Sequence, residues 1–172
     1  MIDQFKKMYS FAQAGLAEGL DKGEEYSKTL TIETAKVLAQ EHGKRNQEFQ
    51  VSKSDIDAYL GAHQKDFDAD MAFFTRNNPN KPNEEQLQGL KASWGELQFR
   101  AEKGRQTGLE KDPVVKVQLK MMRANLLANL HAIGFHFKDG TSVVRQATSQ
   151  RNVKLHVLLP IAKSFDHCPN MC

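Results

Sequence analysis

The chain has 172 residues, of which 40% are hydrophobic and 26% charged, and its formal net charge is +3. This length suffices for one compact domain or two small ones, with enough apolar residues to form a core. Because charges of both signs are interspersed, the small basic excess does not indicate a nucleic-acid or anionic-membrane partner. No run approaches the roughly 20 apolar residues of a membrane span, and residues 1–7 lack the apolar core of a signal peptide.

Residues 1–19 predict a first helix. Its apolar positions recur at steps of four, three, four and three, which places them on one buried face. They are Met1, Phe5, Met8, Ala12 and Gly15. After a break at 19–23, a second helix is predicted from about Glu24 to Gly43, with Gly43 as its C-cap.

A connecting helix is predicted over residues 52–68. Ser52 and Asp55 have the spacing of a capping box, in which each side chain bonds to the other residue's backbone N–H. The acidic stretch 66–70 lacks the turn glycine and closing glutamate of a calcium loop. It therefore indicates an acidic helix end or a surface turn.

The aromatic run 71–74 leads into a loop rich in Asn and Pro at 77–83. Asn83 and Gln86, three residues apart, predict the cap of another helix that runs to about Thr107.

The strongest helix signal follows Asp112, which suits the N-cap, and Pro113, which suits the first helical position. Apolar residues then recur at steps of four, three, four and four, and Leu126, in the middle of this stripe, is expected in the core. The stripe consists of Val115, Leu119, Met122, Leu126 and Leu130. The helix is expected to end near Ile133.

The remaining tail, 134–172, has a different texture and leaves two readings open. It could form short strands, with a hairpin about Asp139-Gly140 and a strand at 153–159, or it could lie irregularly on the helices. Cys168 and Cys172 could form a disulfide, remain free, or join His167 in binding a metal whose other ligands come from a distance.

An internal repeat connects the two halves of the helical region. Shifting the sequence by 89 positions aligns residues 12–42 with 101–131 without a gap, and ten of these 31 positions are identical. The identities include the turn residues Gly19-Leu20 and Gly108-Leu109. We therefore predict a mostly α fold, residues 1–133, in which two related helical hairpins (1–43 and 84–133) pack with the connecting helix.

No catalytic arrangement is evident in the sequence. It has no phosphate loop, dinucleotide turn, paired zinc ligands or serine elbow. Nor do basic and aromatic residues gather as in a single-strand nucleic-acid groove. We expect no catalytic residue, no metal site, no cofactor and no nucleic-acid partner.

Two stretches of the chain resemble the helical chaperone segment of the SurA and PrsA type of bacterial foldases. One is the glycine-leucine turn with Asp-Pro and the basic, leucine-rich helix that follows, at 101–115, 118–123 and 126–128. The other is the capped helix with its Ile, Tyr, His and Phe positions, at 51–67. The resemblance covers most of residues 10–133 and implies a chaperone of the periplasm or cell envelope.

The chain departs from that family in one important respect. Members usually carry a parvulin prolyl-isomerase domain, and residues 155–159 faintly resemble its first strand, but only 13 residues follow Leu159. A complete isomerase domain is not expected in them, so the resemblance extends to the chaperone part and not to the isomerase activity.

The expected function is therefore non-enzymatic binding of unfolded or partly folded polypeptide through Met and aromatic surfaces on helices, which adapt to varied apolar segments. Candidate client-binding residues, each of which could instead belong to the core, are Tyr59, Phe67, Phe73, Phe74, Trp94, Met121 and Met122. One alternative is a helical module for one fixed protein partner or for itself, as a homo-oligomer. Another is a chaperone fragment of a prolyl isomerase whose catalytic domain lies elsewhere.

Overall fold

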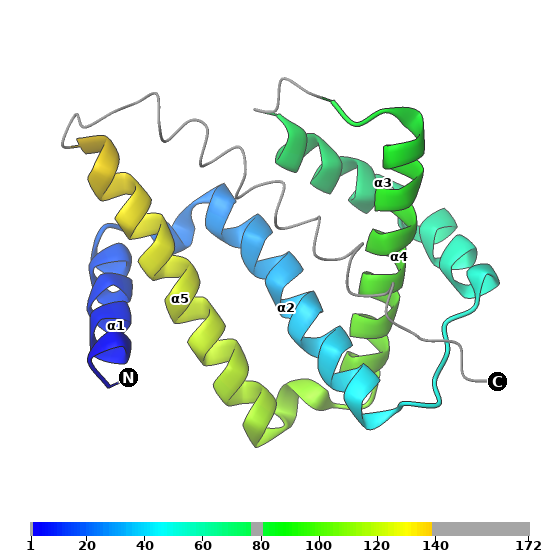
Figure 1. Ribbon diagram of the computed structural model, residues 1–172, viewed down its shortest axis with the longest axis horizontal. Helices are drawn as coiled ribbons and strands as arrows, with labels where there is room; N and C mark the ends of the chain where they lie inside the picture. The colour runs from blue at the N-terminus through cyan, green and yellow to red at the C-terminus, as the bar shows by residue number, and fades with distance from the viewer. Residues whose placement is uncertain (1, 77–80, 139–172) are drawn as a thin grey trace. The chain divides into compact units, whose positions relative to one another are not determined.

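The computed structural model describes residues 2–76 and 81–138, the last four through their backbone alone (Figure 1). Its elements are α1 (Ile2–Ala17), η1 (Leu20–Lys22), α2 (Glu24–Arg45), α3 (Lys53–Thr75), α4 (Glu84–Gln106), η2 (Leu109–Lys111) and α5 (Pro113–Lys138), where η marks a single 3-10 turn. Within these described ranges there is no strand. The predicted mostly α fold is confirmed.

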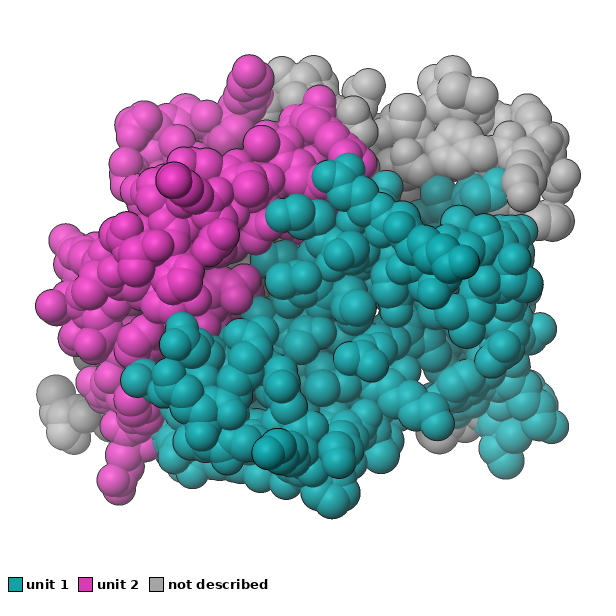
Figure 2. All heavy atoms as spheres, turned by 180° about the vertical axis from the view of Figure 1, so that it is seen from behind, with its two compact units in different colours: residues 1–47, 101–143 teal, residues 48–100, 144–172 magenta. Residues whose placement is uncertain are grey.

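The chain divides into two compact units (Figure 2). Among the described residues, unit 1 comprises 2–47 and 101–138, and unit 2 comprises 48–76 and 81–100. Unit 1 thus contains α1, α2, α5 and the last turn of α4. Unit 2 contains α3 and the rest of α4.

The predicted internal repeat is present in the structure. With the 89-residue shift, the end of α1 coincides with the end of α4, η1 coincides with η2, and α2 and α5 begin at equivalent positions. Gly19 has φ 73° and ψ 22°, and Gly108 has φ 75° and ψ 19°. Both lie in the left-handed region, which glycine enters without the steric cost that a Cβ brings. The same backbone conformation therefore turns the chain in both copies.

Each repeat also uses a second glycine to let another helix approach. An ideal Cβ on Gly15 of α1 would lie 3.0 Å from the carbonyl oxygen of Leu127 on α5, and one on Gly104 of α4 would lie 3.1 Å from that of Leu38 on α2. The same shift relates Gly15 to Gly104 and Leu38 to Leu127. Each glycine packs against the other repeat, so the two repeats exchange equivalent contacts.

The core of unit 1 forms where α1 and α2 pack against α5. Ala12 of α1 meets a cluster of small and branched residues on α5, namely Ala124, Leu127 and Ala128, with Met8, Leu20 and Tyr26 packed around it. Val115 and Leu119 are also buried. The prediction that Leu126 belongs to the core is wrong, since it is only partly buried. The buried side of α5 changes along the helix: it packs on α2 near the start and on α1 farther along. The buried residues therefore do not follow the single predicted stripe.

Asp112 caps α5, as predicted. Its Oδ1 accepts hydrogen bonds from the backbone N–H groups of Val114 at 2.8 Å and Val115 at 3.2 Å. Its Oδ2 accepts one from Arg45 Nη1 at 2.9 Å, which ties the end of α2 to the start of α5. The Arg45 guanidinium and these N–H groups lower the pKa of the Asp112 carboxyl. α2 runs to Arg45 with Asn46 as its C-cap, so the predicted C-cap at Gly43 is wrong, because Gly43 lies inside the helix.

In unit 2, α3 begins with the predicted capping box of Ser52 and Asp55. The helix continues to Thr75, past the predicted end at residue 68, with a kink at His63, where φ is −118° and ψ is 22°. The acidic stretch 66–70 is therefore inside the helix, and the predicted helix end or surface turn there is wrong. Asn83 and Gln86 cap α4 reciprocally at 3.0 and 2.8 Å, as predicted.

α5 continues beyond the predicted end at Ile133 to Lys138. Residues 134–138 are thus helical, so neither the short strands nor the irregular course left open for the tail describes them. The turn at Asp139-Gly140, the strand at 153–159 and the fate of Cys168 and Cys172 lie outside the described residues.

Candidate functional site

Most of the aromatic side chains that the sequence suggested for binding lie in the core of unit 2. Phe67, Phe73, Phe74 and Trp94 are each less than one tenth exposed, and Tyr59 is partly buried. Phe73 and Phe74, adjacent on α3, pack edge to face at 5.1 Å between ring centroids. The core interpretation therefore fits these four rings better than a role in binding.

Trp94 lies at the centre of this aromatic core. Its ring meets Phe67 edge to face at 5.6 Å and Tyr59 at 6.4 Å, and its indole N–H donates to Asp70 Oδ2 at 3.2 Å. All three partners come from α3. A buried indole with its N–H bonded is a typical structural tryptophan. Its surroundings indicate how α3 is held on α4.

The exposed large apolar side chains within the described part of the chain belong to α1 and α5. They are Ile2, Phe5, Tyr9, Phe11, Leu16, Val114, Val117 and Met121. Met121 was a predicted site residue and is 37% exposed, whereas its predicted neighbour Met122 is partly buried. The Phe11 ring packs beside the ring of His131 on α5, with 5.6 Å between the ring centroids.

Six of these residues form two apolar stripes on the N-terminal halves of α1 and α5. The spacing is three and then four in each helix, so each stripe follows one helical face. We call the six residues the open face: Ile2, Phe5 and Tyr9 on α1, and Val114, Val117 and Met121 on α5. They are between 37% and 71% exposed.

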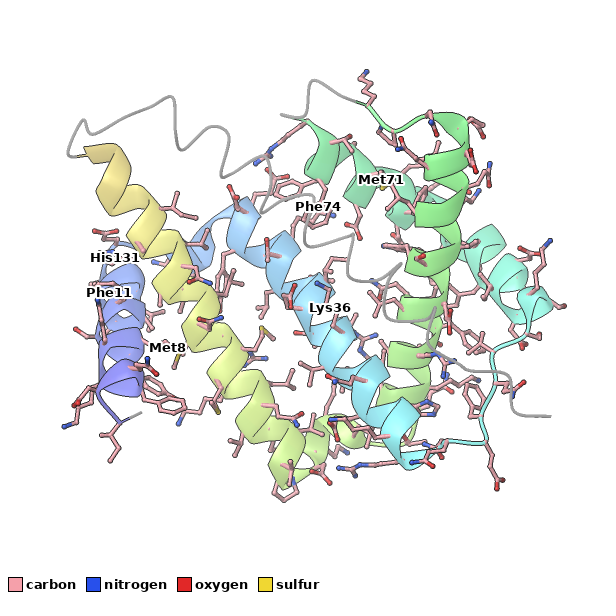
Figure 3. All side chains as sticks on the ribbon, viewed as in Figure 1. Met8, Phe11, Lys36, Met71, Phe74 and His131 are labelled. Atoms are coloured by element: carbon pink, nitrogen blue, oxygen red, sulfur yellow. The ribbon has the colours of Figure 1, made fainter. Side chains whose placement is uncertain are left out.

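The register of α1 on α5 places the two stripes at the same level. Both helices run in the same direction (Figure 1), and Ala12 packs in the cluster that contains Ala124. Both rise by the same amount per residue, so Tyr9 and Met121 lie one turn before this contact, and Phe5 and Val117 lie two turns before it. Met8 points from α1 toward α5 beside the open face (Figure 3).

The sequence predicted a single stripe on α1 that included Phe5 in the core. Ala12 and Gly15 are buried and Met8 partly so, but Phe5 is 42% exposed. The signal that could have shown this is the second series Ile2, Phe5 and Tyr9, which lies beside the buried series on the same helix. A helix with two adjacent apolar series has more apolar surface than one neighbour covers.

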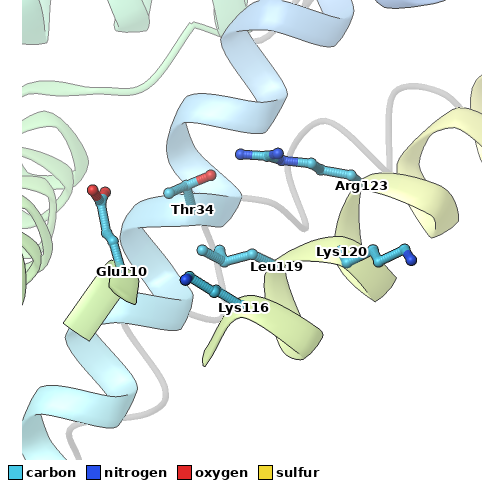
Figure 4. A pocket seen from close by; sticks show the side chains of 6 residues that line it. All are labelled: Thr34, Glu110, Lys116, Leu119, Lys120 and Arg123. Carbon is cyan, nitrogen blue, oxygen red and sulfur yellow. The ribbon is translucent and has the colours of Figure 1, made fainter. Parts of the chain in front are cut away.

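Basic residues flank the open face and line an adjacent cavity. The N-terminal halves of α1 and α5 carry Lys6, Lys7, Lys116, Lys120 and Arg123, against Asp3 alone among acidic residues. A cavity of about 410 Å³ in unit 1 is lined by Thr34, Glu110, Lys116, Leu119, Lys120 and Arg123 (Figure 4). The Glu110 carboxylate lies 3.3 Å from Arg105 Nε, which partly neutralises it. The local charge therefore favours an anionic group, such as a carboxylate.

The other polar contacts of unit 1 serve packing. Glu41, buried on α2, accepts from Lys44 Nζ at 2.6 Å and from Gln118 Nε2 on α5 at 3.3 Å. The hydrogen bond from Lys44 is the main reason why the pKa of Glu41 is lowered. Burial raises the pKa of Tyr26, and the nearby Arg123 opposes this shift. Among the described residues, no three His, Cys, Asp or Glu side chains come together as metal ligands would.

Comparisons with known proteins give no relative from which a function could be carried over. No family model matches the chain, and no similar curated protein or solved structure was found. Within the described ranges no helix has the length and apolar character that crossing a membrane requires.

Proposed function

We propose that this chain binds unfolded or partly folded polypeptides as a non-enzymatic chaperone or foldase module. The observation that supports it is the open face, an apolar surface on two adjacent helices with basic residues at its edge. Exposed apolar side chains gathered along one face of a helix are typical of a surface that meets a partner. The resemblance to periplasmic foldases supports the same activity and would place it in the periplasm or cell envelope.

The chemistry of the open face suits varied partners. Phe5, Tyr9 and Met121 combine flat rings with a flexible, polarisable thioether, which adapts to apolar segments of different shape. Branched Val114 and Val117 add apolar area with little side-chain entropy to lose on binding. Of the seven residues that the sequence suggested, the proposal keeps Met121 as a contact. It adds the open-face residues of α1, together with Val114 and Val117 of α5.

A helical module for one fixed partner is the second candidate. It is favoured by the fit of α3 on α4, which shows that this chain builds close helix contacts around an aromatic anchor. The two candidate functions differ in how many different proteins the chain binds. A chaperone protects several unrelated unfolded proteins, whereas a fixed-partner module protects none and binds one protein, or a second copy of itself.

The test is the double substitution Phe5→Ser with Met121→Ser. Both side chains are exposed, so the thermal unfolding midpoint should change little. Burial of one such apolar side chain is worth about 1.5–3 kcal/mol, and 1.4 kcal/mol is tenfold in affinity. We expect the variant to need more than about tenfold higher concentration to suppress light scattering when two unrelated, chemically unfolded proteins are diluted into buffer.

Leu16→Arg is the matched control. Leu16 is 43% exposed on α1, beyond the contact of Gly15 with α5, and the second repeat carries Arg105 at the equivalent position. This change removes an exposed apolar side chain outside the open face and should leave protection unchanged. Equal protection by the wild type and the Phe5 and Met121 variant would rule the proposal out.

A further inference from the structure

We propose that the occupant of the open face is an acidic amphipathic helix, which lies on α1 as α3 lies on α4. This inference rests on the proposed function, because it specifies what kind of polypeptide segment the open face takes. It follows from a comparison of equivalent positions in the two repeats, which share the turn between their helices but differ in what covers them.

Three equivalent positions differ in exposure between the repeats. Phe5 corresponds to Trp94, Tyr9 to Gln98, and Met121 to Ile32, under the same 89-residue shift. Phe5, Tyr9 and Met121 are exposed, whereas Trp94 is 4% exposed, Gln98 8% and Ile32 fully buried. Positions on α1 and α5 are therefore exposed where the equivalent positions on α4 and α2 are buried.

In unit 2 the cover over Trp94 is α3, an amphipathic helix. Its Phe67 and Tyr59 rings meet the indole, and its Leu60 approaches so closely that a Cβ on Gly95 would lie 2.9 Å from Leu60 Cγ. The helix is also acidic, since Lys53–Thr75 carries five Asp residues and two Lys. The repeat thus shows, within one chain, the kind of element that an aromatic residue at this position accepts.

The first repeat differs from the second at the position where α3 approaches α4 most closely. Where α4 has Gly95, α1 has Lys6, which is exposed. A helix on α1 cannot approach as closely there, and a leucine in the place of Leu60 would face an ammonium group. A carboxylate at that place would pair with Lys6. Lys116 and Lys120 add positive charge on α5, so the occupant should be acidic along its edges.

The experiment measures binding of fluorescent synthetic peptides to the full chain. The parent peptide has the sequence of Lys53–Thr75, and a second peptide carries Leu60→Glu. We expect the wild-type chain to bind the Glu peptide at least about threefold more tightly than the parent. Helix content measured by circular dichroism should rise on binding. A scrambled peptide of the same composition should bind at least about tenfold more weakly, because its apolar residues do not share a face.

A change in the chain should reverse this preference. Lys6→Gly restores the residue of the second repeat and should make the parent peptide the tighter ligand. Lys7→Gly removes the same charge one position along the helix and should keep the wild-type order. Phe5→Ser with Met121→Ser should weaken both peptides at least about tenfold.

The outcomes separate this inference from the proposed function. If the scrambled peptide binds as well as the parent, or if binding produces no helix, the occupant is not an amphipathic helix. If Lys6→Gly leaves the order of the two peptides unchanged, the pairing with Lys6 is wrong. In each case protection of unfolded proteins that depends on Phe5 and Met121 would still support the proposed function. Loss of that dependence would refute both.

Discussion

Single glycines decide how closely the helices of unit 1 approach each other. Gly15 and Gly104 face backbone oxygens across helix contacts, and no flexible side chain can move to make room there. Gly43, in the last turn of α2, has nothing within 4 Å of an ideal Cβ. The same residue type therefore has opposite roles at these positions. At two of them the missing Cβ permits a contact, and at the third it only weakens the helix.

Alanine substitutions should separate these roles. Gly15→Ala and Gly104→Ala should each lower the free energy of unfolding by about 1–3 kcal/mol, because an added methylene in a packed contact forces the helices apart. Gly43→Ala should raise it by about 0.5–1 kcal/mol, because alanine favours the helix. The second repeat already has Ala132 at this position. Urea unfolding checks all three, and a stabilising Gly104→Ala would show that the contact with Leu38 is looser than described.

At the scale of an element, the start of α5 depends on one carboxylate. Asp112 accepts from two backbone N–H groups of the first turn and from Arg45 at the end of α2. Both kinds of contact favour the ionised carboxyl, which is why the pKa of Asp112 is lowered in the folded chain. A lowered folded pKa means that the ionised form stabilises the fold above the unfolded pKa of about 3.9.

Asp112→Asn should test this linkage. Asparagine is also a good N-cap, so the variant should keep α5 and lose mainly the pairing with Arg45. We expect the wild type to be more stable than the variant near neutral pH. This advantage should shrink as the pH falls below about 3.9, because Asp112 becomes protonated. Urea unfolding of both chains across this pH range measures the difference, and an advantage that persists in strong acid would contradict the assignment.

For the whole molecule, the sequence predicted the helices and the repeat but not which apolar faces remain open. The turns and caps are local, so Ser52, Asp112 and the Gly-Leu pairs could be recognised from a few neighbouring residues. Phe5 and Phe74 could not be assigned in this way. Both are aromatic residues on amphipathic helices, and their exposure depends on which helix covers them. That information comes from packing between distant segments. Phe5, predicted in the buried stripe of the first helix, is exposed, and Phe74, for which the sequence leaves both a core and a binding role open, is buried.

Substitutions at Phe74 and at Phe5 should therefore affect different properties, stability for Phe74 and binding for Phe5. Phe74→Ala should lower the free energy of unfolding by about 3–5 kcal/mol, because the ring is 5% exposed and its loss leaves a cavity. At a temperature where this variant is still folded, its protection of an unfolded protein should equal that of the wild type. Thermal unfolding and light scattering, measured on the same samples, check both expectations. A small change in stability together with a loss of protection would show that Phe74 contacts the unfolded protein and is not a core residue.

The reciprocal contacts of Gly15 with Leu127 and Gly104 with Leu38 have the topology of a domain-swapped dimer, with both copies joined in one chain. Separate copies would have to find each other in solution, and their folding would depend on concentration. Covalent linkage replaces that encounter by an effective concentration of about millimolar order. It also allows the two copies to differ in sequence. One copy can keep its aromatic position covered by α3 while the other leaves its own exposed, which a symmetric pair of identical chains could not do.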